Sequence, residues 1–230
     1  MKTIAIIVAA GKGKRIRSKL PKQFLSVGGK PILAYTIEKF DKSRLIDEII
    51  VVIPRGYLNC CSNKIIDKFG FSKVKKIIIG GKERRDSVFK GLKIIDSNTD
   101  IVLIHDGVRP LVKTKKINEI VKFCQKHGPV ILGLPIKETI KRVESGKAIT
   151  TLDRNKIWAV QTPQAFPYKV IMHAYKEADK DKFVGTDDSQ LVERMGIEVR
   201  VIEGDEDNIK ITTAKDLKIA EHLLRKEISR

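Results

Sequence analysis

Short apolar runs alternate with amphipathic segments through the first half of the chain. The apolar runs are rich in β-branched residues, which is typical of strands buried on both faces of a sheet. They span residues 3–8, 48–53, 74–79, 101–105 and 130–136. Helical spacing appears between them, at 31–40, 58–69, 86–95 and 115–126. This alternation predicts right-handed βαβ crossovers, and therefore an α/β fold with a doubly wound, mostly parallel, Rossmann-like sheet.

A different pattern follows the fifth apolar run. Residues 138–143 and 148–152 are short, alternating and charged, with a Glu-Ser-Gly-Lys turn between them. This predicts a two-stranded β-ribbon that is too polar for the buried sheet. Because an isolated hairpin is only marginally stable, we expect 137–156 to form a projecting arm that packs against a second subunit. Helical spacing returns at 167–178, 187–195 and 216–227, with a further strand at 198–202.

The turn after the first predicted strand combines small residues with cations. Ala9-Ala10-Gly11-Lys12-Gly13 offers backbone N–H groups that an anion can approach closely, and Lys14, Arg15 and Lys22 follow. A dinucleotide-binding fingerprint is excluded, because Ile16 stands where its third glycine is needed, and the P-loop pattern is absent as well. The turn therefore predicts a polyphosphate site; the alternative is a glycine turn with solvated lysines.

Further polar segments follow the predicted strands at the edge where ligands bind in such sheets. After the fourth strand, Asp106 could hold Mg²⁺ and Arg109 could grip a phosphate, or the two could form a structural ion pair. After the third strand, Gly81 and Ser87 could contact a nucleobase, or could belong to an ordinary helix start. The roles of the later polar segments 161–164, 186–189 and 207–210 stay open, and Thr186 would serve equally in a helix cap.

Composition narrows the class of ligand. The 230 residues include 46 Lys plus Arg against 28 Asp plus Glu, a net charge of +18 that attracts polyanions. These charges are spread along the chain, aromatic residues are few and no nucleic-acid-binding signature occurs. We therefore expect small phosphorylated substrates, no nucleic acid and, for want of a long apolar stretch, no membrane. The three cysteines lack the spacing of a zinc site, which favours free thiols in a cytoplasmic protein. The length favours one domain, 1–230.

In this order, the segments resemble the cytidylyltransferases that act on 2-C-methyl-D-erythritol 4-phosphate in the non-mevalonate isoprenoid pathway. The resemblance covers essentially the whole chain. Its most specific parts are the glycine loop with Pro21-Lys22-Gln23, His105-Asp106 with Arg109-Pro110, and Gln161-Thr162-Pro163-Gln164. It implies transfer of CMP from CTP to 2-C-methyl-D-erythritol 4-phosphate, a Mg²⁺ cofactor and a homodimer. One departure is Gly107-Val108, where the family commonly has two alanines. Since valine also occurs there in ribitol 5-phosphate cytidylyltransferases, such an enzyme stays the alternative. A basic nucleic-acid-binding protein is a more remote alternative.

The resemblance also implies roles for individual residues. Arg15 and Lys22 would stabilise charge on the CTP α-phosphate, and Asp106 would help to hold Mg²⁺. The residues expected to contact CTP are Ala9, Ala10, Gly11, Lys12, Gly13, Gly81, Ser87, Asp106 and Gly107. The residues expected to position the acceptor are Arg109, Thr162, Thr186 and Lys210, together with Thr139 and Arg154 from the arm of the second subunit.

Overall fold

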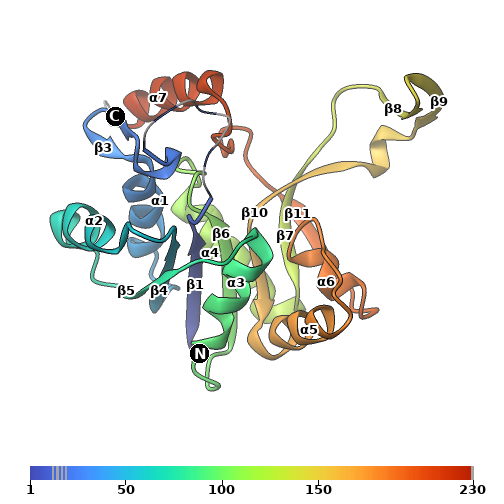
Figure 1. Cartoon of the computed structure of the whole chain (residues 1–230). Helices are drawn as coiled ribbons and strands as arrows, with labels where there is room; N and C mark the ends of the chain where they lie inside the picture. Colours follow the sequence, from blue (N-terminus) through green and yellow to red (C-terminus); the bar gives the residue numbers. More distant parts are fainter. Residues whose placement is uncertain (12, 14–15, 17, 19, 229–230) are drawn as a thin grey trace.

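The fold is given by a computed structural model that describes residues 1–11, 13, 16, 18 and 20–228. A seven-stranded sheet lies at its centre, in the order β11-β7-β10-β6-β1-β4-β5 (Figure 1). Its strands are β1 (Thr3–Val8), β4 (Glu48–Ile53), β5 (Val74–Ile79), β6 (Ile101–Asp106), β7 (Val130–Pro135), β10 (Trp158–Pro167) and β11 (Arg200–Glu203). β10 pairs antiparallel with β6 and β7, and the remaining pairings are parallel. The predicted α/β fold with a mostly parallel sheet is confirmed.

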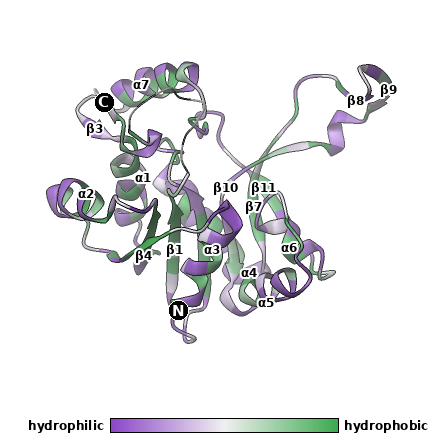
Figure 2. Cartoon of the chain, in the orientation of Figure 1, coloured by the Kyte–Doolittle hydropathy of each residue, from purple (hydrophilic) through white to green (hydrophobic). Residues whose placement is uncertain are grey.

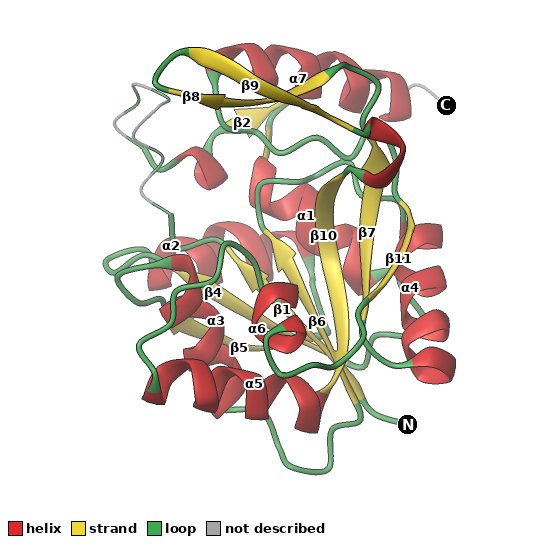
Figure 3. Cartoon of the chain, turned by 90° about the vertical axis from the view of Figure 1, so that its right-hand side faces the viewer, coloured by secondary structure: helices red, strands yellow, loops and turns green. Residues whose placement is uncertain are grey.

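Helices cover both faces of this sheet (Figure 3). The helices are α1 (Ile32–Asp41), α2 (Leu58–Cys61), α3 (Arg84–Lys93), α4 (Thr114–His127), α5 (Tyr168–Lys180), α6 (Ser189–Glu193) and α7 (Ala214–Ile228). Shorter helical segments are η1 (Lys22–Phe24), η2 (Ser62–Asp67), a π-helical segment that continues α2, and η3 (Arg154–Lys156). Among the described residues, no helix has both the length and the apolar character that a membrane span requires.

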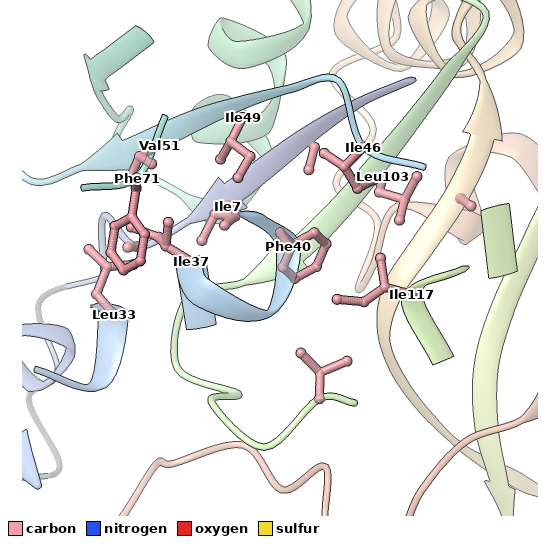
Figure 4. Close-up of a cluster of buried hydrophobic side chains, with 14 of the residues drawn as sticks. Ile7, Leu33, Ile37, Phe40, Ile46, Ile49, Val51, Phe71, Leu103 and Ile117 are labelled. Atoms are coloured by element: carbon pink, nitrogen blue, oxygen red, sulfur yellow. The ribbon is translucent and has the colours of Figure 1, made fainter. Parts of the chain in front are cut away.

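β1 shows how the two helical layers are held. Successive strand residues point to opposite faces, so a strand buried on both faces is apolar throughout. Ala5 and Ile7 pack with residues of α1 and α4 on one face, part of which is shown in Figure 4. Ile4 and Ile6 pack with residues of α3, α5 and α6 on the other. Figure 2 shows β1 and β4 as hydrophobic strands among helices of mixed character. This double burial fixes the strand ends that carry the polar segments.

Two small antiparallel sheets lie outside the central one: β2 (Ser26–Val27) with β3 (Lys30–Pro31), and β8 (Ile140–Glu144) with β9 (Lys147–Leu152). In Figure 1 the β8–β9 ribbon extends away from the central sheet. β9 is exposed along its whole length, and Val143 and Ile149 are 56% and 47% exposed. The part that this ribbon plays in a dimer stays a prediction.

β10 is a strand that the hydrophobic pattern did not indicate. Its middle reads Gln-Thr-Pro-Gln, and a proline within a run argues against a central strand. The structure accommodates Pro163 at a shift of register between Gln161 and Gln164 in the pairing with β7. Bulges of this kind re-aim side chains next to active sites. β10 therefore brings buried polar residues to the end of β6, where apolar residues would otherwise be expected.

Candidate active site

Two cavities open at the carboxyl ends of the parallel strands. The larger, of about 800 Å³, is lined by the turns after β1, β4 and β5. The smaller, of about 400 Å³, is lined by β10 and by the segment that leads into α6. Arg84, Asp106 and Lys210 line both cavities. Ligands in the two cavities would therefore meet at a shared wall made of one carboxylate and two cations.

Close backbone approach builds the larger cavity. A Cβ at Gly80 would lie 2.3 Å from the Cβ of Ala10, and a Cβ at Gly107 would lie 2.8 Å from the Cβ of Ala9. The turns after β1, β5 and β6 can approach one another this closely only because these positions lack side chains. Buried Gln23 fixes the first turn by donating from Nε2 to the carbonyl oxygens of Ala9 and Gly11. The Pro-Lys-Gln motif thus contributes a structural residue as well as Lys22.

Lys22 lines the larger cavity, as predicted for a residue that acts on CTP. Its Nζ donates to the carbonyl oxygen of Ile211 at 2.8 Å, which places it beside the segment that carries Lys210. Gly13 lies against it, since a Cβ there would be 3.2 Å from the Cγ of Lys22. Lys12 and Arg15 lie outside the described residues, so their predicted roles rest on the sequence alone.

Asp106 is the carboxylate of the shared wall and is only 5% exposed. Its Oδ1 accepts from Arg84 Nε at 3.0 Å, and its Oδ2 lies 2.8 Å from Lys210 Nζ and 3.8 Å from Arg109 Nε. Burial by itself raises the pKa of this carboxyl, but Arg84, Lys210 and Arg109 outweigh burial and hold the pKa well below its usual range. Asp106 is therefore ionised at neutral pH.

A single buried carboxylate fits one kind of Mg²⁺ site. Mg²⁺ is commonly held by one or two carboxylates together with substrate phosphates, rather than by a cage of protein ligands. The described part of the chain contains no group of three or more His, Cys, Asp or Glu that could hold a metal ion. Asp106, ionised and reachable from both cavities, suits a site that substrate phosphates complete.

The smaller cavity brings together the residues predicted for the acceptor. Arg109, Thr162, Thr186 and Lys210 all line it. Arg109 donates from Nη1 to the carbonyl oxygen of Asn208 at 2.6 Å. Its Nε is buried and makes no hydrogen bond within the described part of the chain. This Nε instead faces Asp106, whose Oδ2 lies 3.8 Å away. The cavity can thus bind a phosphate at the cationic wall and hydroxyl groups beyond it.

The predicted cytosine-side residues also line their cavity. Gly81 and Ser87 both belong to the wall of the larger cavity. The hydroxyl of Ser87 donates to the carbonyl oxygen of Glu83 at 3.0 Å and accepts from the backbone N–H of Gly81 at 3.0 Å. Because its one hydrogen is already donated, this hydroxyl can only accept from a ligand.

Thr139 and Arg154 are not brought to either cavity within one chain. Both are exposed, on the segments that flank the β8–β9 ribbon. Arg154 donates from Nη1 to the carbonyl oxygen of Lys137 at 2.9 Å. Their predicted contact with the acceptor requires the ribbon of a second copy, which stays a prediction.

Two residues of the site, Arg84 and Asp188, had no individual role assigned from the sequence. Arg84 binds Asp106 from the start of α3, and Asp188 binds Arg84 from the residue before α6. The two lie 104 positions apart in the chain. The sequence signal that could have indicated them is that each lies at the start of a helix, among charged residues. That pattern is also typical of ordinary helix caps.

His105, beside Asp106, is fully buried and fully hydrogen-bonded. Its Nε2 lies 3.2 Å from the carbonyl oxygen of Arg109, which can only accept, so Nε2 carries the hydrogen. Nδ1 therefore accepts from the hydroxyl of Thr162 at 3.1 Å, and that hydroxyl in turn accepts from the backbone N–H of Asp106 at 3.1 Å. Burial lowers the pKa of His105 to about 3, so the ring is neutral and braces the end of β6.

Acid should destabilise the fold through His105. In the unfolded chain a histidine has a pKa of about 6.5, whereas the pKa of His105 in the folded protein is about 3. As the pH falls through this window, the unfolded state binds a proton that the folded state does not. This histidine therefore removes about 1.4 kcal/mol from the free energy of unfolding per pH unit.

Urea unfolding of wild type and His105→Asn between pH 7 and 4 measures this effect. The variant should lose stability less steeply with acid, by about that slope. The exposed histidine variant His222→Asn should follow wild type. Equal slopes for wild type and His105→Asn would contradict the expectation.

Comparison with known proteins agrees with the motifs and the site. The family model for 2-C-methyl-D-erythritol 4-phosphate cytidylyltransferase (IspD) matches residues 3–226. Proteins of that name from Clostridium acetobutylicum and Geobacter metallireducens are 47% and 42% identical to this chain; the alignments cover 96% and 99% of this chain and 97% and 100% of those proteins. The crystal structure of 4-diphosphocytidyl-2C-methyl-D-erythritol synthase from Anaerococcus prevotii matches with a TM-score of 0.86 and 33% identity, covering 97% of this chain and 96% of that one. The resemblance inferred from the sequence is confirmed, and the chain belongs to the 2-C-methyl-D-erythritol 4-phosphate cytidylyltransferase family.

Proposed function

We propose that the protein transfers CMP from CTP to 2-C-methyl-D-erythritol 4-phosphate, giving 4-diphosphocytidyl-2-C-methyl-D-erythritol and pyrophosphate. The observation that carries this proposal is the pair of cavities with a shared wall of Arg84, Asp106 and Lys210. CTP would occupy the larger cavity and the polyol phosphate the smaller. Their reacting phosphates would then meet at the wall.

The reaction joins two anions, so repulsion and alignment are its main barriers. An oxygen of the acceptor phosphate attacks the α-phosphorus of CTP in line, and the bond to the β-phosphate oxygen breaks to release pyrophosphate. Transfers of this kind are catalysed chiefly by positioning and by fixed positive charge. Lys22 supplies charge in the larger cavity, and Arg109 and Lys210 supply it in the smaller. Mg²⁺, when held by Asp106 and the phosphates, would neutralise further negative charge.

The acceptor phosphate needs no general base, because a phosphate monoester is already largely ionised at neutral pH. His105 is the histidine nearest to the reacting groups in sequence, but both its ring nitrogens are occupied within the chain. Its low pKa, caused by burial, also makes it a very weak base. This supports a mechanism without protein-mediated proton transfer.

The hydroxyl of Ser87 supports cytosine as the base. Since it donates to Glu83 and can only accept from a ligand, it suits a base edge that carries an amino group. Cytosine presents such a group at N4, whereas uracil presents an oxygen there. The same hydroxyl would face an unmatched acceptor if UTP were bound.

Val108 suggested ribitol 5-phosphate as the alternative acceptor, but its position weakens that argument. Val108 is 6% exposed and packs with a cluster around α7. It belongs to the wall of the larger cavity and is not among the described residues that line the smaller one. A residue on the nucleotide side bears little on acceptor choice. The family match also favours methylerythritol phosphate.

Pyrophosphate release with CTP and Mg²⁺ tests the function directly. Methylerythritol phosphate and ribitol 5-phosphate should be supplied in parallel, with a sample that lacks acceptor as control. Release with methylerythritol phosphate alone is the expected result. Release with ribitol 5-phosphate alone would move the protein to the alternative acceptor, and no release with either would favour a basic nucleic-acid-binding protein.

We further propose a homodimer in which the ribbon of one chain reaches the smaller cavity of the other. The ribbon carries exposed apolar side chains at Val143, Ile149 and Leu152, and Val160 at the rim of the smaller cavity is 42% exposed. Exposed apolar side chains on a protruding element favour contact with a partner. This arrangement would bring Thr139 and Arg154 to the acceptor.

Arg154→Ala should raise the KM for the acceptor by about 10- to 100-fold, the cost of a lost hydrogen bond to a charged group. Mixing Arg154→Ala with Lys22→Ala protein should restore activity, because a mixed dimer holds one site with both Lys22 and Arg154. After full subunit exchange, about a quarter of all sites would be intact. Steady-state kinetics of each variant and of the mixture measure both effects.

Arg142→Ala is the matched control, since Arg142 is an exposed arginine of the same ribbon that pairs with Glu144. It should leave the KM for the acceptor near that of wild type. No recovery of activity in the mixture, despite demonstrated subunit exchange, would argue against a shared site.

A reducing, cytoplasmic environment is part of the proposal. Cys60, Cys61 and Cys124 are free thiols. Burial raises the pKa of both Cys61 and Cys124 to about 12, so these thiols stay protonated and unreactive. They are suited to core packing rather than to redox chemistry.

A further inference from the structure

A chain of buried hydrogen bonds leads from α5 to the shared wall of the two cavities. The hydroxyl of Tyr175 donates to Asp188 Oδ1 at 2.5 Å. Asp188 accepts from Arg84 Nη1 at 3.0 Å and from Nη2 at 2.8 Å. Arg84 then donates from Nε to Asp106 Oδ1 at 3.0 Å. Three side chains thus connect the interior of the protein to the carboxylate at which the two substrates would meet.

The geometry fixes Arg84 tightly. The paired contact with one carboxylate sets the plane of a guanidinium group as well as its position. Asp188 is 1% exposed and Tyr175 is 2% exposed, so neither has water as an alternative partner. A buried carboxylate in this setting is stable only while its hydrogen bonds are complete. Tyr175 therefore fixes Asp188, and Asp188 fixes Arg84.

Three cations lie beside Asp106, namely Arg84, Lys210 and Arg109, and the first two differ in how they are held. Arg84 is held by two hydrogen bonds to buried Asp188. Lys210, in contrast, has a flexible side chain that is 40% exposed. An arriving phosphate competes with Asp106 for the ammonium group of Lys210. The contact with Arg84 does not compete in this way, because its other two nitrogens are held by Asp188.

We propose that Tyr175, Asp188 and Arg84 are positioning residues, which hold the Asp106 carboxylate in place at the shared wall while Lys210 transfers to a substrate phosphate. A carboxylate that faces phosphates is repelled by them, so a fixed cation behind it is needed to keep it there. The contact between Arg84 and Asp188 also connects the walls of the two cavities. Arg84 is the first residue of α3, which follows the Gly80-Gly81 turn of the larger cavity, and Asp188 precedes α6 beside the smaller cavity. This inference rests on the proposed function.

Tyr175→Phe tests the inference with a small change. It removes one hydroxyl and keeps the ring that stacks on Phe89, whose centroid lies 5.5 Å away. The kcat should fall by about 10-fold, the usual effect of losing a partner behind a metal ligand, with the KM for the acceptor within about twofold. CTP binding measured by calorimetry should weaken several-fold in Mg²⁺ and stay unchanged in EDTA.

Tyr168→Phe is the matched control. Tyr168 is also a buried tyrosine of α5, and its hydroxyl lies within hydrogen-bonding distance of the carbonyl oxygens of Leu92 and Ile95, at 3.4 and 3.3 Å. The two variants should lose similar thermal stability. Only Tyr175→Phe should lose kcat and the Mg²⁺-dependent part of CTP affinity.

Asp188→Asn is the stronger variant, for which we expect a loss of kcat on the order of 100-fold. If Asp188→Asn fails to fold, the comparison of Tyr175→Phe with Tyr168→Phe is sufficient to test the inference. Equal kcat for these two variants, or equal weakening of CTP binding in Mg²⁺ and in EDTA, would overturn the inference. Absence of pyrophosphate release by wild type would instead refute the proposed function, so the two failures are distinguishable.

Discussion

Replacing Lys22 by alanine is expected to lower kcat by about 10²- to 10³-fold, as for the loss of one strong donor to a transition state. Lys22 lines the larger cavity, and its ammonium group is held beside Ile211, next to the shared wall. Its charge is thereby fixed before substrate arrives, so little reorganisation is needed as negative charge builds on the α-phosphate. Pre-steady-state measurement of pyrophosphate release would isolate this step from product release.

Lys90→Ala is the appropriate control for Lys22→Ala. Lys90 also lines the larger cavity, but its Nζ donates to the carbonyl oxygen of Gly80, on the turn after β5. Its removal should leave kcat close to that of wild type. Near-normal turnover by a folded Lys22→Ala protein would remove Lys22 from the mechanism. The sequence predicts an equal loss for Arg15→Ala.

Asp106→Asn should abolish most activity, with a fall in kcat of at least about 10³-fold, since both fixed charge and the ligand proposed for Mg²⁺ are lost. The amide keeps the shape of the side chain but leaves Arg84 and Lys210 without their shared counter-charge. Breaking a buried ion pair from one side costs about 3–5 kcal/mol. Urea unfolding should therefore show reduced stability alongside the loss of activity.

The control for this variant is Asp205→Asn, because Asp205 pairs with Lys113 and lines neither of the two cavities. It should retain kcat while losing some stability. If Asp106→Asn turned over CTP at the wild-type rate across a Mg²⁺ titration, neither the carboxylate nor the metal proposed at the wall would be needed.

The sequence predicted the parallel centre of the sheet well because β1, β4 and β6 are buried on both faces. β1, β4 and β5 have the bounds that their apolar runs indicated. β10 was missed because its inner residues are polar: Gln161, Thr162 and Gln164 are buried but satisfied by hydrogen bonds to distant parts of the chain. Hydrophobic periodicity carries no signal for a strand that is stabilised in this way.

The site was predictable where it depends on strand ends, and unpredictable where it depends on distant packing. Asp106 follows a strand whose position the sequence defines, and its placement beside the glycine turns follows from the topology. The contact between Arg84 and Asp188 joins residues 104 positions apart through the packing of α3 against α5 and α6. No local pattern encodes such a contact. The roles of Thr139 and Arg154 are harder still to predict, since they depend on contact with another chain.

The wall between the two cavities also has a consequence for ligand design. Because Arg84, Asp106 and Lys210 face both sides, ligands of the two cavities can be joined across it by a bridge as short as a diphosphate. A molecule joined in this way loses its translational freedom once rather than twice, so two weakly binding fragments become one tight ligand without any new contact. The wall is therefore the natural place at which to link a nucleoside fragment to a polyol fragment.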